Sequence, residues 1–174
     1  IWDEEEIGLV GSAAYADSAA YNGEQIIGVL NYDMIAWDSN NDFVLTLGTN
    51  TLSQALTNEY QEVMSIYTPE LTWNYTNIEA SDHASFWYQN YPAILAIEEY
   101  PGDFNAYYHT PEDKFSNLNI IFFTRMVQAA VAGLASEGWN CKMRLQHQPV
   151  LSGVGTGDQT AILTAVSPRT IEKI

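Results

Sequence analysis

Strand-length runs of apolar residues alternate with helix-length segments along this chain, and no other feature constrains its fold as strongly. Residues 25–34, 43–48 and 92–100 have the length and composition of buried strands. Residues 51–67 carry apolar side chains at helical spacing, as do residues 117–138. Strands interleaved with helices predict an α/β layered fold. With 174 residues, the chain is long enough to bury a hydrophobic core.

The long helix predicted over residues 117–138 marks a change in composition. Five of its apolar residues fall on one face: Phe123, Val127, Ala130, Val131 and Leu134. Gly138 is the expected end of the helix. Beyond it the chain is rich in Gly, Thr and Val, with one strand expected in "QTAILTAV". We therefore divide the chain into a domain portion, residues 1–138, and residues 139–174. The latter form either a tail over the core or, as we favour, the first strand of an appended β-module.

Charge and cysteine content exclude several classes of partner. The formal net charge is −16, and the first basic residue is Lys114. Such a surface repels nucleic acid and anionic membranes, so neither is expected as a partner. The single cysteine, Cys141, excludes an internal disulfide and a thiolate zinc cluster. The chain starts at Ile1 without a Met, which indicates a processed or excised segment. Its low basic content with many Tyr, Trp, Asn and Thr favours a secreted or extracellular protein, with the periplasm as an alternative, and the glycosylation sequon at Asn74 matters only on a secretory route.

Acidic and histidine side chains stand near the ends of the predicted elements. Glu5 and Glu6 precede a helix-like segment, Asp33 ends the strand at 25–34, and His109 follows the strand at 92–100. Ligands of open α/β sheets bind beyond the carboxyl ends of strands, so these side chains are candidates for one crevice. Glu, Asp and His without Cys form the ligand set of hydrolytic zinc sites. Of two adjacent glutamates, one can bind the metal while the other takes a proton from water.

Each of these residues taken singly also has a purely structural interpretation. An acidic run before a helix is commonly a solvated turn favoured by the helix dipole. Asp33 can be a turn residue, and Thr110 with Pro111 can begin a helix after His109. Ser81 can cap the segment that follows it. The residues by themselves leave both interpretations open.

Four motifs in a fixed order resemble those of a known family. The segments EEIGLVGSAAYA, NYDMI, SDHASFW and YYHTPEDKF resemble the co-catalytic zinc aminopeptidases, which include bacterial leucyl aminopeptidases and aminopeptidase Y. The resemblance extends from Glu4 to Glu137. It implies a three-layer zinc-exopeptidase fold with a mixed central sheet, here incomplete on its N-terminal side. It also implies a metallo-aminopeptidase with two zinc ions that removes N-terminal residues from peptides.

The same resemblance implies a role for each candidate residue. Glu5 would be the general base that deprotonates the bridging water. Glu6 and His109 would bind one zinc ion, and Asp33 would bind the other.

Further residues would surround this centre. Asp82 and His83 would lie close to the metals or in the pocket wall. Apolar and aromatic residues would line the pocket for the substrate's first side chain: Met34, Leu95, Ile97, Phe104 and Tyr108. Such a lining implies a preference for bulky apolar N-terminal residues.

The sequence also departs from the family pattern. The family uses a histidine and a metal-bridging aspartate upstream of the paired glutamates, and this sequence begins only four residues before Glu5. We therefore expect a carboxyl-terminal portion of a longer enzyme, inactive alone, with the missing N-terminal part as a candidate partner beside the peptide substrates. Two alternatives stay open: a non-catalytic structural or interaction module on the same fold, and a single-zinc enzyme like glutaminyl cyclase.

Overall fold

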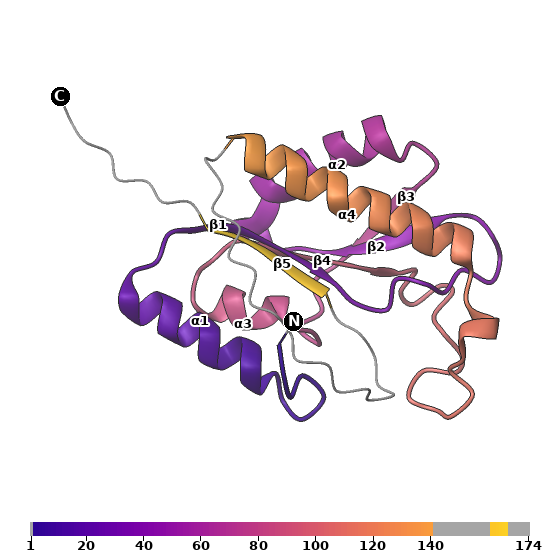
Figure 1. Ribbon diagram of the computed structural model, residues 1–174, viewed down its shortest axis with the longest axis horizontal. Helices are drawn as coiled ribbons and strands as arrows, with labels where there is room; N and C mark the ends of the chain where they lie inside the picture. Colours follow the sequence, from indigo (N-terminus) through magenta and orange to yellow (C-terminus); the bar gives the residue numbers. More distant parts are fainter. Residues whose placement is uncertain (1, 141–160, 167–174) are drawn as a thin grey trace.

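A mixed sheet lies between two layers of helices in the computed structural model, which describes residues 2–140 and 161–166 (Figure 1). The strands are β1 (Ile26–Tyr32), β2 (Val44–Gly48), β3 (Thr72–Thr76), β4 (Ala93–Glu98) and β5 (Ala161–Val166). Their order in the sheet is β3-β2-β4-β1-β5. β1 is parallel to β4 and β2 to β3, whereas the β2–β4 and β1–β5 pairs are antiparallel. The prediction of an α/β fold with a mixed central sheet is confirmed.

Helices cover both faces of the sheet. α1 (Val10–Asn22) and α3 (His83–Tyr88) lie on one face, and α2 (Gln54–Tyr67) and α4 (Ile120–Asn140) lie on the other (Figure 1). The short 3₁₀ turns η1 (Thr51–Ser53) and η2 (Phe115–Asn117) precede α2 and α4. Each helical layer encloses its own core against the sheet. This arrangement buries both faces of β1, which explains why that strand is almost continuously apolar.

The two cores differ in size. The larger lies under α2 and α4 and includes Leu30, Leu45, Tyr60, Phe122 and Met126. The smaller lies under α1 and α3 and includes Ala16, Ala19, Val29, Phe86 and Ala93.

The helix predicted at residues 117–138 exists as α4, but it begins at Ile120 and its predicted end is wrong. Its predicted face is right only in part, because Ala130 packs against the larger core. α4 continues through Gly138 to Asn140. Three residues of the predicted face are exposed: Phe123, Val127 and Val131. Phe122, Met126 and Ala129 are buried instead. Gly133 allows α4 to present this face to the core, because a Cβ at this position would lie 2.8 Å from the Tyr60 ring.

One strand was missed, and another extends the sheet. β3 was not predicted because it is a short edge strand of five residues, none of which is fully buried. The strand expected in "QTAILTAV" corresponds to β5, which pairs with β1 at the opposite edge. Residues 141–160 and 167–174 lie outside the described residues, so the division of the chain at residue 138 stays a prediction. Among the described residues, no helix has both the length and the hydrophobicity that a membrane span requires.

Candidate active site

The parallel pair β1 and β4 positions one side of the site. Because parallel neighbours end at the same edge of a sheet, the residues that follow them lie side by side. Asp33 directly follows β1, and its N–H donates to the Ala96 carbonyl at 3.2 Å. The Glu98 N–H donates to the Met34 carbonyl at 2.9 Å. The loop at residues 99–113, which carries His109, therefore starts beside Asp33.

The turn before α1 supplies the other side. The N–H groups of Gly8 and Leu9 donate to the Glu5 carbonyl at 3.1 and 2.9 Å, which closes a tight turn. α1 is fixed against α3 by a hydrogen bond between the Ser12 and Ser85 hydroxyls at 2.8 Å. This contact holds the paired glutamates of the turn against the ends of the strands.

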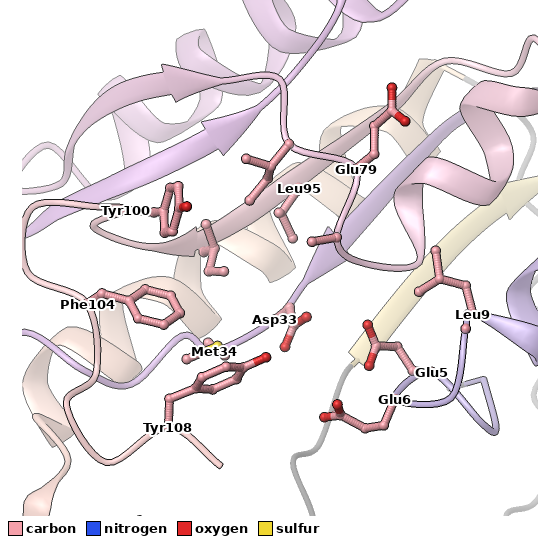
Figure 2. A pocket seen from close by; sticks show the side chains of 14 residues that line it. Glu5, Glu6, Leu9, Asp33, Met34, Glu79, Leu95, Tyr100, Phe104 and Tyr108 are labelled. Atoms are coloured by element: carbon pink, nitrogen blue, oxygen red, sulfur yellow. The ribbon is translucent and has the colours of Figure 1, made fainter.

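Together these segments enclose a pocket of about 460 Å³. Figure 2 shows Glu5 and Glu6 on one side of it, Tyr100, Phe104 and Tyr108 on the other, and Asp33 between the two sides. Its lining includes Glu5, Glu6 and Asp33, and all five residues predicted for the apolar wall: Met34, Leu95, Ile97, Phe104 and Tyr108. Sequence reasoning missed further lining residues: Gly8, Leu9, Ile78, Glu79, Ala80 and Tyr100. Three of these six follow β3, which the sequence had not revealed.

His109 reaches this centre from the loop. Its Nε2 lies 3.0 Å from Oε1 of Glu6, and both side chains are about half exposed. The imidazole stacks on the Tyr108 ring with the centroids 3.7 Å apart. An oxygen and a nitrogen donor at this separation can bind one cation together.

Glu5 has the electrostatic environment of a proton acceptor. Burial is the main cause that raises the pKa of its carboxyl from 4.5 to about 7. The next causes are neighbouring negative charges, in decreasing order Asp33, Glu6 and Asp82, while His109 acts in the opposite direction. The four candidate residues 5, 6, 33 and 109 are thus brought together in space. A carboxylate with a pKa near neutrality suits general base catalysis.

Asp33 is oriented by a residue that sequence reasoning assigned differently. The Ser81 hydroxyl donates to Oδ2 of Asp33 at 2.8 Å. It accepts a hydrogen bond from Nδ2 of Asn31 at 2.7 Å. Asn31 and Ser81 are both buried. Ser81 therefore fixes the Asp33 carboxylate, and a side-chain cap on α3 is absent.

Asp82 and His83 are fully buried and do not line the pocket. Burial raises the pKa of the Asp82 carboxyl, and a side-chain hydrogen bond with Ser12 opposes this shift. His83 donates from Nε2 to the Ile78 carbonyl at 3.0 Å and packs edge-on against Trp87. Because Ile78 lines the pocket, His83 supports its wall from behind.

His83 leads to a prediction about acid stability. Burial lowers the pKa of His83 from 6.5 to about 4, so the unfolded chain binds this proton more tightly than the folded one. The stability contributed by the neutral ring is present above pH 6.5 and is lost as the pH falls towards 4. At about 1.4 kcal/mol per pKa unit, the full loss is roughly 3 kcal/mol.

Replacing His83 with Gln keeps a donor for Ile78 and removes the titration. We expect urea denaturation to show a smaller loss of unfolding free energy between pH 6.5 and 4 in this variant. Equal losses in both proteins would contradict a buried neutral His83.

Strained backbone conformations gather around the same pocket. Seven non-glycine residues of the described chain have positive φ, and three of them lie at the site: Leu9, Met34 and His109. Such conformations cost of the order of 1–3 kcal/mol each and cluster at functional sites. The fold thus tolerates local strain where Glu5, Asp33 and His109 are displayed.

The donors present fit part of a zinc site. Glu6 and His109 offer an oxygen and a nitrogen 3.0 Å apart, and Asp33 offers a carboxylate oriented by Ser81. Carboxylate and imidazole are zinc ligands of catalytic sites. Across residues 2–140 and 161–166, however, no group of three or more His, Cys, Asp or Glu is arranged to hold a metal ion by itself. A zinc ion here needs further ligands.

A three-layer fold with paired glutamates, an aspartate and a histidine at the strand ends defines a metallopeptidase-like α/β protein. The sequence profile of peptidase family M28 matches residues 1–133. The chain belongs to this family.

Individual relatives agree with this assignment. The chain is 29% identical over 119 residues to a protein of Arthroderma otae named "Probable leucine aminopeptidase", a match that covers 66% of this chain and 31% of that protein. The LapA aminopeptidase of Legionella pneumophila superposes with a TM-score of 0.70 at 27% identity, over 78% of this chain and 36% of LapA. BSAP, a zinc aminopeptidase from Bacillus subtilis, shares the fold with a TM-score of 0.67 at 19% identity, over 79% and 34%. The chain thus spans about a third of the length of these relatives.

Proposed function

We propose that this chain is part of a zinc-dependent aminopeptidase that hydrolyses N-terminal residues from peptides and prefers bulky apolar ones. The observation that carries the proposal is the convergence of Glu5, Glu6, Asp33 and His109 beside an apolar pocket. Membership of peptidase family M28 and the leucine aminopeptidase relative support it.

The chain's own residues have distinct tasks in this reaction. Glu6 and His109 would hold one zinc ion and Asp33 the other. When bound, zinc polarises a carbonyl and lowers the pKa of water from ~15.7 to ~7. Glu5 would take the proton from the attacking water and pass it to the leaving amine. Ser81 keeps the Asp33 carboxylate in one orientation during these steps.

The remaining zinc ligands would come from an N-terminal part of the same protein that precedes Ile1. Glu6, His109 and Asp33 are too few to complete two zinc sites, because a catalytic zinc ion uses three protein ligands. The chain's net charge of −16 would attract the positively charged α-amino group of a peptide. Such an enzyme would act outside the cell, as the composition favours.

The apolar wall predicts a graded substrate preference. Met34, Leu95, Ile97, Phe104 and Tyr108 line the pocket. A methylene more or less in such a pocket changes the transition-state energy by only ~1–3 kcal/mol, so p-nitroanilides of Leu, Met and Phe should differ by about tenfold in kcat/KM. The Glu p-nitroanilide should be more than about 100-fold slower, because its carboxylate would be desolvated without a partner.

The assay uses the polypeptide that includes the proposed N-terminal part, with and without a zinc chelator. Activity that survives removal of zinc would contradict the proposal. Release of ammonia from a peptide with N-terminal Gln, without amine release, would favour the glutaminyl cyclase-like alternative. Absence of both reactions in a zinc-loaded protein would favour the non-catalytic alternative.

A further inference from the structure

The loop at residues 99–113 carries His109 and three pocket residues, Tyr100, Phe104 and Tyr108, yet it contains no helix or strand. Phe104 and Tyr108 project from it into the pocket, as Figure 2 shows. Asn105, 6% exposed, is the only buried residue of this loop. A loop with so little burial needs a specific anchor to hold a metal ligand in one place.

Glu98 and Asn105 form such an anchor. Glu98 is the last residue of β4 and is 1% exposed. Its Oε1 accepts a hydrogen bond from the Asn105 N–H at 2.7 Å. The loop is thereby tied to the rigid sheet at a point four residues before His109.

Asn105 extends this anchor to both sides of His109. Its Oδ1 accepts from the Tyr107 N–H at 2.8 Å, and its carbonyl accepts from the Tyr108 N–H at 3.1 Å. Its Nδ2 donates to Oδ1 of Asp113 at 3.0 Å. The residues just before His109 and the end of the loop are therefore bound to one buried residue, Asn105.

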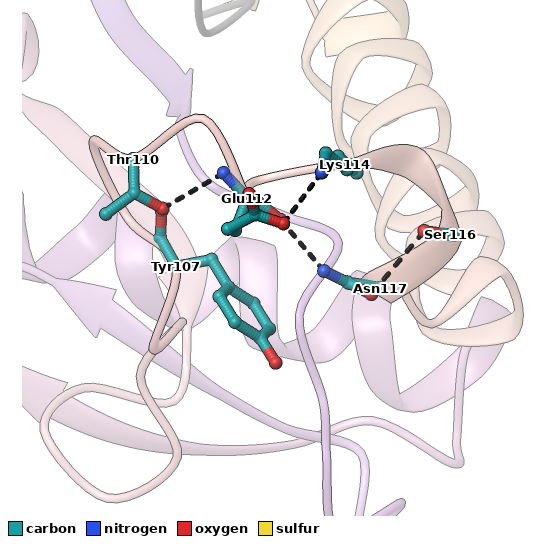
Figure 3. A network of polar contacts seen from close by, with 6 residues as sticks. All are labelled: Tyr107, Thr110, Glu112, Lys114, Ser116 and Asn117. Carbon is teal, nitrogen blue, oxygen red and sulfur yellow. Dashed lines mark hydrogen bonds and ion pairs between the residues drawn. The ribbon is translucent and has the colours of Figure 1, made fainter.

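A second network holds the outside of the loop, but it is exposed. Figure 3 shows Lys114 on Glu112, with an Nζ–Oε2 distance of 2.7 Å, and the Thr110 hydroxyl, which donates to the Tyr107 carbonyl at 2.7 Å. The side chains of the ion pair are more than half exposed. Exposed ion pairs contribute only about 0–1 kcal/mol, so this network is a weak constraint.

The chemistry of Glu98 points to a positional role. A buried carboxyl is costly to desolvate, and here burial raises its pKa to about 8, which the charges of Asp113 and Asp103 reinforce. Removing the carboxyl would leave the Asn105 N–H without this acceptor. An apolar residue at position 98 would avoid this desolvation cost but could not bind the Asn105 N–H. The Glu98 carboxyl therefore serves to position the loop.

We propose that Glu98 and Asn105 are positioning residues that fix the loop so that His109 can bind a metal ion beside Glu6. The part of this inference that concerns metal binding rests on the function proposed above. The part that concerns loop order does not, and the two are tested separately.

Loop order is tested by amide hydrogen exchange in the chain. Glu98→Ala should speed the exchange of the amides of Asn105, Tyr107 and Tyr108 by at least about tenfold, because their hydrogen bonds are broken or loosened. The amides of β1 and β4 should be unaffected. Glu98→Gln keeps an acceptor oxygen of the same shape and should restore slow exchange. Glu112→Ala, which removes a hydrogen-bonded glutamate from the same loop, is the matched control and should leave these amides unchanged.

Metal binding is tested by zinc titration against a competing chelator in the polypeptide with its proposed N-terminal part. Glu98→Ala should weaken zinc binding about 10–100-fold, the range for groups that orient metal ligands. Glu98→Gln and Glu112→Ala should bind zinc like the unmodified protein. Saturating zinc should restore kcat in Glu98→Ala, and unchanged exchange of the β1 and β4 amides separates this result from a general loss of stability, which zinc would also offset.

The partly exposed Asp113 offers a milder variant if Glu98→Ala does not fold. Asp113→Ala should show the same local exchange and a smaller loss of zinc affinity. Unchanged loop exchange in both variants, or an equal rise in all amides, overturns the positioning role. Fast loop exchange with unchanged zinc affinity overturns the link to His109. An unmodified protein that binds no zinc refutes the proposed function, while the exchange result still decides the loop's anchor.

Discussion

Glu5→Gln is expected to lower kcat for peptide hydrolysis about 10²–10⁴-fold while KM and zinc content stay nearly unchanged. Glutamine has the shape of glutamate but cannot accept a proton from water. Glu5 lines the pocket beside Asp33, so its carboxylate can reach a water held there. Since the role is in the transition state, kcat and kcat/KM should fall together.

The adjacent Glu4 provides a matched control for this substitution. Glu4 is exposed and does not line the pocket. Glu4→Gln makes the same change of charge and shape one residue away, and it should leave kcat within about twofold, as is usual for surface groups. Activity retained in Glu5→Gln, or lost equally in Glu4→Gln, would refute the assignment of Glu5 as the general base.

Asp33→Ala is expected to remove one bound zinc ion and to reduce hydrolysis to near background. Losing a partner that only orients a ligand weakens metal binding about 10–100-fold, and losing the ligand itself should exceed this range. The Ser81 hydroxyl at 2.8 Å would also lose its acceptor. Zinc content after dialysis and kcat with added zinc measure both effects.

Asp17→Ala serves as the control for the Asp33 variant. Asp17 lies on α1, away from the pocket lining, where it accepts an exposed hydrogen bond from Gln89 at 2.7 Å. Its removal should alter neither zinc content nor kcat. Full zinc content in Asp33→Ala would show that Asp33 is not a ligand.

Local patterns in the sequence predicted most of the fold because strands and helices leave periodic traces. The apolar run at residues 25–34 became β1, and the helical spacing at 51–67 became η1 and α2. The edge strand β3 leaves no such trace, because its side chains are not required to be apolar. The face of α4 was predicted only in part, because the packing of Gly133 against Tyr60 is a tertiary contact.

The candidate site divides in the same way. Glu5, Glu6, Asp33 and His109 stood out by residue type and by their places after predicted elements. Ser81 did not, because a serine before a helix is a common cap, and only its contact with Asp33 shows another task. Glu98 also went unnoticed, because nothing in a strand sequence marks a buried carboxyl as the anchor of a distant loop.

By itself, the sequence determined the alternation of strands and helices, the acidic surface and the chemistry of the candidate donors. These features depend on residue type and short-range spacing, and both can be read directly from the amino-acid sequence. Only the tertiary structure decided which donors meet. Glu6 and His109 are 103 positions apart and touch because α1 packs on α3 while β1 and β4 end side by side. Such contacts depend on how packed layers fit together, and no local pattern encodes that.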